Sequence, residues 1–214
     1  MKQKTAILFN LLIAAASYAA WLTLIFRLVD SGSFADIGLW SLKYFTILSN
    51  LLNGTVCLVC ALRLRSGRIS AGLQRWKLTG TAAVALTFWV VLLFLGPVFG
   101  YRSMFRGANL WMHLLLPLAG MAAYVLLDHG CRLPGRDSLF AVLAPLVYAL
   151  GYVLNILVNG LGEGFGTNDW YGFLRWGWGI GFCILGVLLL LTWLNALALN
   201  ALNRHFAGKT ARKS

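Results

Sequence analysis

The sequence predicts an all-α, polytopic membrane protein built as a bundle of six transmembrane helices. Of its 214 residues, 60% are hydrophobic and only 11% are charged, whereas soluble domains carry about 25% charged residues. The apolar residues fall into six long runs, and most Lys and Arg residues cluster between them. A soluble fold of this size could not bury so much apolar surface, so lipid must form part of its solvent. The same composition excludes disorder.

Each apolar run approaches the length of about 20 residues that crosses roughly 30 Å of hydrocarbon. The runs are too long and continuous for the alternating strands of a membrane barrel. Helices are then the remaining structure that satisfies its own backbone hydrogen bonds in lipid. We expect one domain, residues 1–214, with spans at Ala6–Phe26, Leu42–Leu62, Leu78–Phe99, Leu110–Leu127, Leu139–Val158 and Trp178–Leu197.

The first run begins in the manner of a secretory signal. Lys2 and Lys4 precede it, and Ser17-Tyr18-Ala19 resembles a cleavage site. The apolar residues nevertheless continue as far as Phe26. This continuation favours a retained helix over a cleaved signal.

The second run carries polar residues on one helical face. Thr46, Ser49, Asn50 and Asn53 follow the spacing i, i+3, i+4 and i+7, and Lys43 precedes Thr46 by three residues. Polar groups inside a span usually face the bundle interior. Packing is the alternative reading, because Thr and Ser often bond a carbonyl one turn back and Asn often joins helices.

Two further runs carry similar faces, and Asn10, Thr81 and Asn195 add some polarity in the inner half of the membrane. In the fourth run, Asn109 and His113 share a face, and His113 is the only histidine within an expected span. In the fifth run, one face carries Tyr148, Tyr152, Asn155 and Asn159. Thr46 and His113 lie roughly 5–6 Å below the outer ends of their spans. Thr46, His113 and Asn155 therefore could meet in the outer half of the membrane.

The distribution of basic residues predicts that both termini are cytoplasmic, because cytoplasmic segments are enriched in Lys and Arg. With this orientation the outside segments hold five of the 18 basic residues, namely Arg27, Lys43, Arg102, Arg106 and Arg175. The inside segments hold the other thirteen, namely Lys2, Lys4, Arg63, Arg65, Arg68, Arg75, Lys77, Arg132, Arg136, Arg204, Lys209, Arg212 and Lys213. Four of the six acids, Asp30, Asp36, Glu163 and Asp169, fall outside. The glycine-rich outer stretch Asn159–Trp176 could fold back over the bundle.

Other classes of function are disfavoured. The net charge of +12 is explained by topology, so we expect no nucleic-acid partner; membrane lipid is the expected partner. Cys57 and Cys60 lie inside an apolar run without a second ligand pair, so we expect no metal. The sequence has no P-loop and no other cofactor motif, so we expect no cofactor.

Two segments resemble a family of bacterial six-span integral membrane proteins. Tyr44-Phe45-Thr46-Ile47-Leu48-Ser49-Asn50 matches its YFTxxSN signature, and His113 to Pro117, followed by Asp128, matches its HxxxP…D segment. Trp170-Tyr171 resembles the aromatic motif of its last outer loop. The resemblance covers nearly the whole chain. It implies a multi-pass protein of a bacterial inner membrane.

That family is distantly similar to the eukaryotic androgen-induced and androgen-dependent TFPI-regulating membrane proteins. Those proteins hydrolyse fatty acid esters of hydroxy fatty acids with a threonine and a histidine, which correspond here to Thr46 and His113. The resemblance implies an acyl-ester hydrolase or acyl-transfer enzyme acting on an acyl lipid. Thr46 is the expected nucleophile and His113 the expected base.

The other polar residues have supporting roles in this hypothesis. Asn50 or Asn155 would stabilise the oxyanion, and Lys43 would attract an anionic headgroup. Ser49, Asn109 and Tyr152 would complete the site. No acid within an expected span orients His113, which favours the alternative of a non-enzymatic transporter, channel or lipid-binding scaffold.

Overall fold

The computed structural model describes residues 2–26, 28, 38–67, 69–162 and 168–211. Arg27, Asp30, Asp36, Arg68, Glu163, Arg212 and Lys213, which entered the topology prediction, lie outside these ranges. The described part is helical and contains no strand. Its elements in chain order are α1 (Lys2–Ile25), η1 (Gly38–Lys43), α2 (Phe45–Arg65), α3 (Ala71–Val90), η2 (Val91–Leu95), α4 (Gly96–Phe99), α5 (Tyr101–Met104), α6 (Ala108–Leu110), η3 (Trp111–Leu115), α7 (Leu116–Leu126), η4 (Gly135–Val142), α8 (Leu143–Asn159) and α9 (Trp178–Ala211).

The prediction of an all-α bundle with six spans is confirmed. Six helical stretches of the described chain are long and apolar enough to cross a membrane: Gln3–Ile25, Phe45–Arg65, Ala71–Phe99, Ala108–Leu126, Gly135–Asn159 and Trp178–Gly208. The third begins at Ala71 rather than at Leu78, so that Lys77 lies within the helix. The prediction assigned Lys77 to a cytoplasmic segment, because such segments are enriched in Lys and Arg and the apolar run begins at Leu78.

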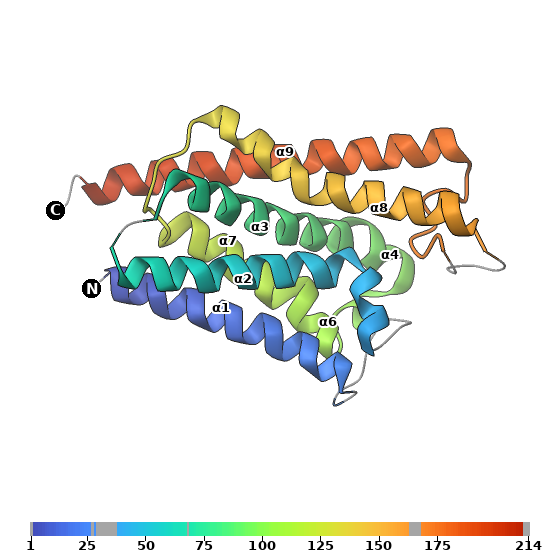
Figure 1. Ribbon diagram of the computed structural model, residues 1–214, viewed down its shortest axis with the longest axis horizontal. Coiled ribbons are helices and arrows are strands. Elements are labelled where there is room, and N and C mark those ends of the chain that lie inside the picture. The colour runs from blue at the N-terminus through green and yellow to red at the C-terminus, as the bar shows by residue number, and fades with distance from the viewer. Residues whose placement is uncertain (1, 27, 29–37, 68, 163–167, 212–214) are drawn as a thin grey trace.

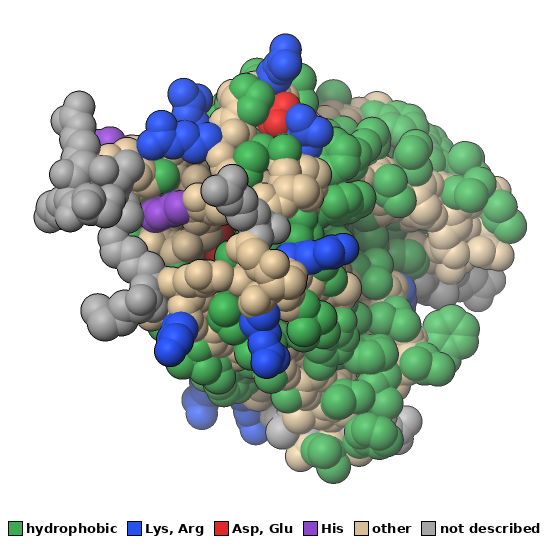
Figure 2. Space-filling view, turned by 60° about the vertical axis from the view of Figure 1, so that its left-hand side comes forward, with side chains coloured by type: hydrophobic (Ala, Val, Ile, Leu, Met, Phe, Trp, Pro, Cys, Tyr) green, Lys and Arg blue, Asp and Glu red, His purple; other side chains and the backbone are tan. Residues whose placement is uncertain are grey.

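The helix α3 occupies the centre of the bundle. It contacts α2 on one side and α7 and α9 on the others, and α1 packs along α2 (Figure 1). The largest cluster of the core joins Leu78 and Ala82 of α3 to Tyr124 of α7 and Ala196 of α9. Both chain ends lie at the same end of the bundle (Figure 1). Lys and Arg side chains are spread over this end, whereas apolar side chains cover the flank beside it (Figure 2).

Small residues allow the central helices to approach closely. A Cβ atom added at Gly80 of α3 would lie 3.0 Å from the Asn53 Cα, and one at Gly120 of α7 would lie 2.9 Å from the Asn53 Nδ2. Asn53 of α2 is fully buried between these two helices. Close backbone contact of this kind is how helices associate in lipid, where apolar side chains gain little by leaving the solvent.

Two spans contain a widened helical turn of π type. One comprises η2 and precedes Pro97; the other comprises η3 and precedes Pro117. Proline has no N–H to continue the helical ladder, which accounts for an irregular turn beside it. His113 lies inside η3. Such turns often occur at functional sites.

The last helix, α9, is 34 residues long. At 1.5 Å per residue it extends about 50 Å, which exceeds the roughly 30 Å of membrane hydrocarbon. Near its far end, the Asn200 and Asn203 amides donate to carbonyl oxygens of Leu133 and Tyr124. These bonds fix α9 to the end of the bundle that carries the termini.

Candidate functional site

A narrow cavity of about 70 Å³ lies between α2, α3, α8 and α9. This is smaller than the 300–1,000 Å³ typical of small-molecule sites, so a bound acyl chain would have to widen it. Most of its wall is apolar. The lining residues are Phe45, Thr46, Leu86, Thr87, Val90, Val91, Leu95, Pro145, Tyr148, Ala149, Tyr152, Tyr171, Phe173, Leu185, Leu188 and Leu189.

Thr46 and Thr87 supply the hydroxyl groups of the helical wall. Thr46 lies in the first turn of α2, and its side chain is largely buried. One turn further along α2, the Ser49 hydroxyl lies 3.1 Å from the Thr87 hydroxyl and 3.1 Å from the Thr46 carbonyl oxygen. Deeper still, Asn53 is enclosed by Gly80 and Gly120. On α2 and α3 the polar lining of the cavity therefore ends at Thr46 and Thr87. Beyond these residues, the two helices are closely packed around Asn53.

Aromatic residues of the segment before α9 form the roof of the cavity. The Phe45 amide, at the start of α2, donates to the Tyr171 hydroxyl over 2.8 Å. The Tyr148 hydroxyl donates to the Lys43 carbonyl over 2.6 Å and accepts from the Trp170 indole N–H over 3.0 Å. These bonds join the segment to the first turn of α2, immediately beside Thr46.

Burial raises the pKa of Tyr171 to about 12, so the phenol is protonated at neutral pH. Its oxygen accepts the Phe45 N–H. Its hydroxyl also hydrogen-bonds the Tyr148 hydroxyl, whose own proton is donated to the Lys43 carbonyl oxygen. Sequence reasoning placed Tyr171 in a motif but gave it no role in the site. The available signal was the neighbouring Trp170-Tyr171 pair in an otherwise glycine-rich segment.

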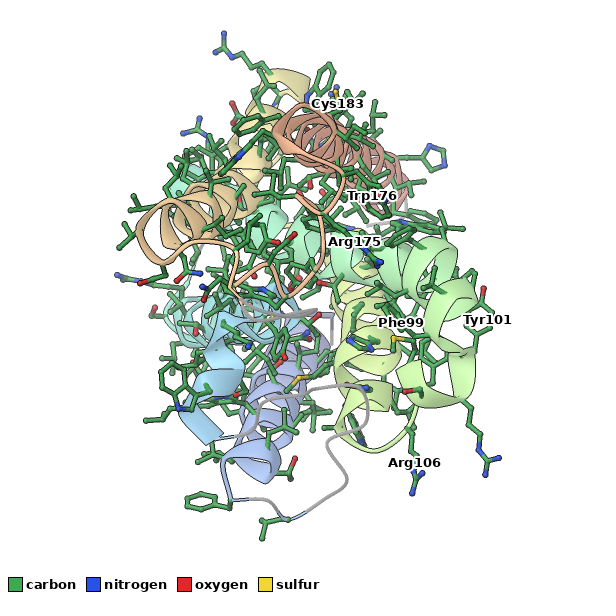
Figure 3. All side chains as sticks on the ribbon, turned by 90° about the vertical axis from the view of Figure 1, so that its right-hand side faces the viewer. Phe99, Tyr101, Arg106, Arg175, Trp176 and Cys183 are labelled. Atoms are coloured by element: carbon green, nitrogen blue, oxygen red, sulfur yellow. The ribbon has the colours of Figure 1, made fainter. Side chains whose placement is uncertain are left out.

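Asp169 fixes the same segment to α8. Its carboxylate accepts a hydrogen bond from the Tyr152 hydroxyl and a second, of 3.0 Å, from the Leu174 amide. Tyr152 is almost fully buried. Its hydrogen bond to Asp169 therefore attaches the segment before α9 to α8. Figure 3 shows the end of the bundle where this segment continues through the labelled Arg175 and Trp176 to the start of α9.

Asn50 connects the Thr46 turn to the His113 turn. Its side-chain amide donates to the Thr46 carbonyl oxygen over 2.8 Å and to the Met112 carbonyl oxygen over 3.0 Å. Both amide protons are thereby used, so Asn50 cannot also donate to an oxyanion in this arrangement. The predicted face of α2 is correct in that Thr46, Ser49, Asn50 and Asn53 are all buried.

His113 lies on the other side of this bridge and is not among the residues that line the cavity. Its Nδ1 is 2.9 Å from the Met104 carbonyl oxygen. A carbonyl only accepts, so Nδ1 carries the proton and Nε2 carries the lone pair. In the described part of the chain, no hydrogen bond joins His113 to the Thr46 hydroxyl. Asn109, one turn earlier, is buried and donates to the Ser103 carbonyl oxygen.

The remaining predicted residues have separate positions. Lys43 ends η1, and its ammonium lies 5.4 Å from the ring centroids of both Tyr44 and Trp170. This places a positive charge above the roof. Asn155 is half-buried on α8 and accepts a hydrogen bond from Asn159. It does not line the cavity, so the expected convergence of Asn155 with Thr46 is not seen there.

A second polar cluster, which the sequence reasoning missed, lies near the terminus-bearing end. The Lys77 ammonium lies 3.4 Å from the Asp128 carboxylate, 2.6 Å from the Asn10 side-chain oxygen and 2.7 Å from the Cys57 sulfur. Lys77 and Asp128 are essentially inaccessible to solvent. Asn10 donates to the same carboxylate over 2.8 Å. The sequence did offer a sign of this cluster, because Asn10 and Cys57 are polar or polarisable residues within the first two expected spans.

The chain has no match among protein-family models, curated proteins or solved structures. The functional argument consequently depends on the geometry of the site.

Proposed function

We propose that the protein takes a lipid acyl chain into the cavity between α2, α3, α8 and α9 and acts on its ester bond with the Thr46 hydroxyl. The observation that carries this proposal is the position of Thr46. Its side chain lines a mostly apolar cavity at the level where the Tyr148 and Tyr171 phenols form the roof. An acyl chain fits the Leu-rich wall, and the ester group would lie beside the hydroxyl groups.

The proposed reaction is transfer of an acyl group through an acyl-threonine. The Thr46 oxygen attacks the ester carbonyl carbon while a base takes its proton, and the alcohol leaves with a proton returned by that base. Water then cleaves the acyl-threonine to give a carboxylic acid; a second alcohol in its place would make the reaction an acyl transfer. The Tyr171 hydroxyl is our candidate donor to the oxyanion, in place of Asn50 and Asn155, and it would exchange its hydrogen bond with Tyr148 for one to the oxyanion.

His113 is the proposed base because the tautomer held by Met104 leaves the lone pair on Nε2. The Asn50 side-chain amide donates to backbone carbonyl oxygens of both helical turns, at Thr46 and at Met112, the residue before His113. For His113 to take the proton of Thr46, the two side chains need one bridging water or a change of rotamer when the lipid enters. In this proposal both termini face the cytoplasm and the cavity lies in the outer half of a bacterial inner membrane.

The test is hydrolysis of fatty acyl esters by the purified protein in lipid nanodiscs. We expect Thr46→Val and His113→Gln to lower the rate by at least about a hundredfold, the usual contribution of a nucleophile or general base. Thr46→Ser should retain a measurable rate because it keeps the hydroxyl. Thr81→Val is the matched control, since Thr81 is a buried hydroxyl outside the cavity lining.

The second candidate function is a lipid-binding scaffold without chemistry, and the absence of His113 from the cavity lining favours it. The two are separated by measuring binding together with hydrolysis. A photoreactive fatty acyl ester that labels α9 near Leu188, with no ester cleaved by the unmodified protein, would establish the scaffold and reject the enzyme. Cleavage that survives Thr46→Val unchanged would also reject the Thr46 mechanism.

A further inference from the structure

An open groove lies at the terminus-bearing end, where the start of α3 meets η4 and the start of α8. It is lined by Arg75, Arg136, Asp137, Leu139, Phe140 and Leu143 and has a volume of about 370 Å³. Figure 2 shows this end of the molecule, on which Lys and Arg side chains gather. The groove and the Thr46 cavity share no lining residue, although Leu143 of the groove and Pro145 of the cavity are only two residues apart on α8.

Two guanidinium groups flank the groove, one paired with a carboxylate and the other exposed. Arg75 is held by Asp137 through a 2.7 Å bond from Nε, which leaves both terminal nitrogens of that guanidinium available. Arg136 is exposed and makes no ion pair or hydrogen bond with the residues that the structure describes. With one carboxylate against two guanidiniums, the groove keeps a net positive charge. Guanidinium geometry suits phosphate oxygens in particular.

The apolar half of the groove continues along α8. Leu139 is 57% exposed and Leu143 is 39% exposed. Val147 and Leu150 follow at helical spacing and are 66% and 62% exposed. Together these four side chains form a strip on α8 that leads away from the arginines towards the middle of the membrane. Such a strip is the surface along which a hydrocarbon chain lies.

An aromatic pair marks the level of the membrane boundary. The Trp76 and Phe140 rings meet edge to face with centroids 5.3 Å apart, and Trp76 is partly exposed. Tryptophan prefers the headgroup layer of a bilayer. The arginines beside this pair therefore lie at the depth of lipid phosphates, and the α8 strip lies at the depth of acyl chains.

We propose that this groove is a binding site for an anionic glycerophospholipid. The phosphate contacts Arg75 and Arg136, and one acyl chain lies along Leu143, Val147 and Leu150. The positive charge of the groove repels the ammonium of a zwitterionic headgroup, which selects an anionic lipid. Basic pockets between helices at a membrane surface bind such headgroups. The proposal does not rest on the proposed function, because the groove shares no lining residue with the Thr46 cavity.

Native mass spectrometry of the full chain in detergent tests the proposal, with phosphatidylglycerol, phosphatidylcholine and inorganic phosphate as probes. We expect phosphatidylglycerol to be retained in preference to phosphatidylcholine. Arg136→Gln should weaken phosphatidylglycerol binding about fivefold, the effect of one basic residue near an anionic lipid. The control is Arg65→Gln at the end of α2, which removes an equally exposed charge outside the groove and should have little effect.

Three results would overturn the proposal. An equal loss of phosphatidylglycerol in Arg65→Gln and Arg136→Gln would mean that total charge, and not the groove, attracts the lipid. Equal retention of phosphatidylcholine would remove the charge argument. Complete displacement of phosphatidylglycerol by millimolar inorganic phosphate would show that the chain along α8 contributes nothing. Because the Arg136 side chain is exposed and makes no hydrogen bond or ion pair with the described residues, we expect its replacement to leave the fold intact.

Discussion

The ammonium of Lys77 and the carboxylate of Asp128 lie 3.4 Å apart and are both wholly buried inside the bundle. The ammonium donates hydrogen bonds to the Asn10 side-chain oxygen and the Cys57 sulfur, and the Asp128 carboxylate supplies the opposite charge. The cluster joins α1, α2, α3 and α7. Asn203 adds α9 by donating to the Asp128 carbonyl oxygen over 3.1 Å. A charge pair thus connects five of the six spans.

Removing one member of this pair is expected to be costly. Asp128→Ala should lower the free energy of unfolding by about 3–5 kcal/mol, because it leaves a buried charge without compensation. The double variant Lys77→Met with Asp128→Leu should recover most of that loss. The measurement is denaturant unfolding in a fixed detergent. Arg75→Gln, which breaks the more exposed pair with Asp137, is the control and should cost at most about 1 kcal/mol. Equal costs for both pairs would show that burial is not the cause.

Gly80 should tolerate no larger residue. In Gly80→Ala the new Cβ would lie 3.0 Å from the Cα of Asn53, and that backbone cannot move without separating α2 from α3. We expect a loss of about 1–3 kcal/mol in the free energy of unfolding, as for other overpacked sites. Gly151→Ala is the matched control, because no atom lies within 4 Å of the added Cβ. A neutral Gly80→Ala variant would contradict the close packing of the two helices.

Tyr171→Phe should loosen the first turn of α2. The change removes the acceptor of the Phe45 amide, so hydrogen exchange at that amide should become faster. The expected cost is about 0.5–1.5 kcal/mol for one hydrogen bond. Tyr101→Phe is the control, since it removes an exposed phenol bonded to the Leu92 carbonyl oxygen and should leave the Phe45 amide unchanged. If hydrogen exchange at the Phe45 amide is unchanged in both variants, the bond to Tyr171 does not stabilise the first turn of α2.

Leu188→Trp should block the cavity between α2, α3, α8 and α9. Leu188 lines this cavity, so the larger side chain occupies the space proposed for the acyl chain and reduces photolabelling by an acyl lipid several-fold. Leu190→Trp places the same side chain on the exposed side of α9 and should leave labelling unchanged. If both variants label equally well, the lipid does not enter the cavity.

The sequence predicted the spans well because lipid imposes a simple length rule on apolar helices. Periodicity also placed Thr46, Ser49, Asn50 and Asn53 correctly on a buried face, since a helix fixes which residues share a side. The residues to which that face would bond could not be predicted. Asn50 meets the Met112 carbonyl oxygen, and periodicity carries no information about distances between helices.

Two features escaped prediction for the same physical reason. The burial of Lys77 could not be predicted because its contacts with Asp128, Asn10 and Cys57 depend on residues remote in sequence. Asn155 was expected beside Thr46 because both lie at similar depths. Depth does not determine rotation about the helix axis, and the structure has Asn155 bonded to its own helix neighbour Asn159.

The length of α9 makes it a suitable site for a fusion that would help electron microscopy of this protein. Its 34 residues carry the helix about 20 Å past the hydrocarbon layer at 1.5 Å per residue, and Asn200 and Asn203 clamp it to the bundle. A soluble helical domain spliced in phase after Ala207 would therefore project in a fixed direction. Such a chimera would supply the rigid extramembrane mass that a protein of 23.5 kDa lacks for particle alignment in electron microscopy.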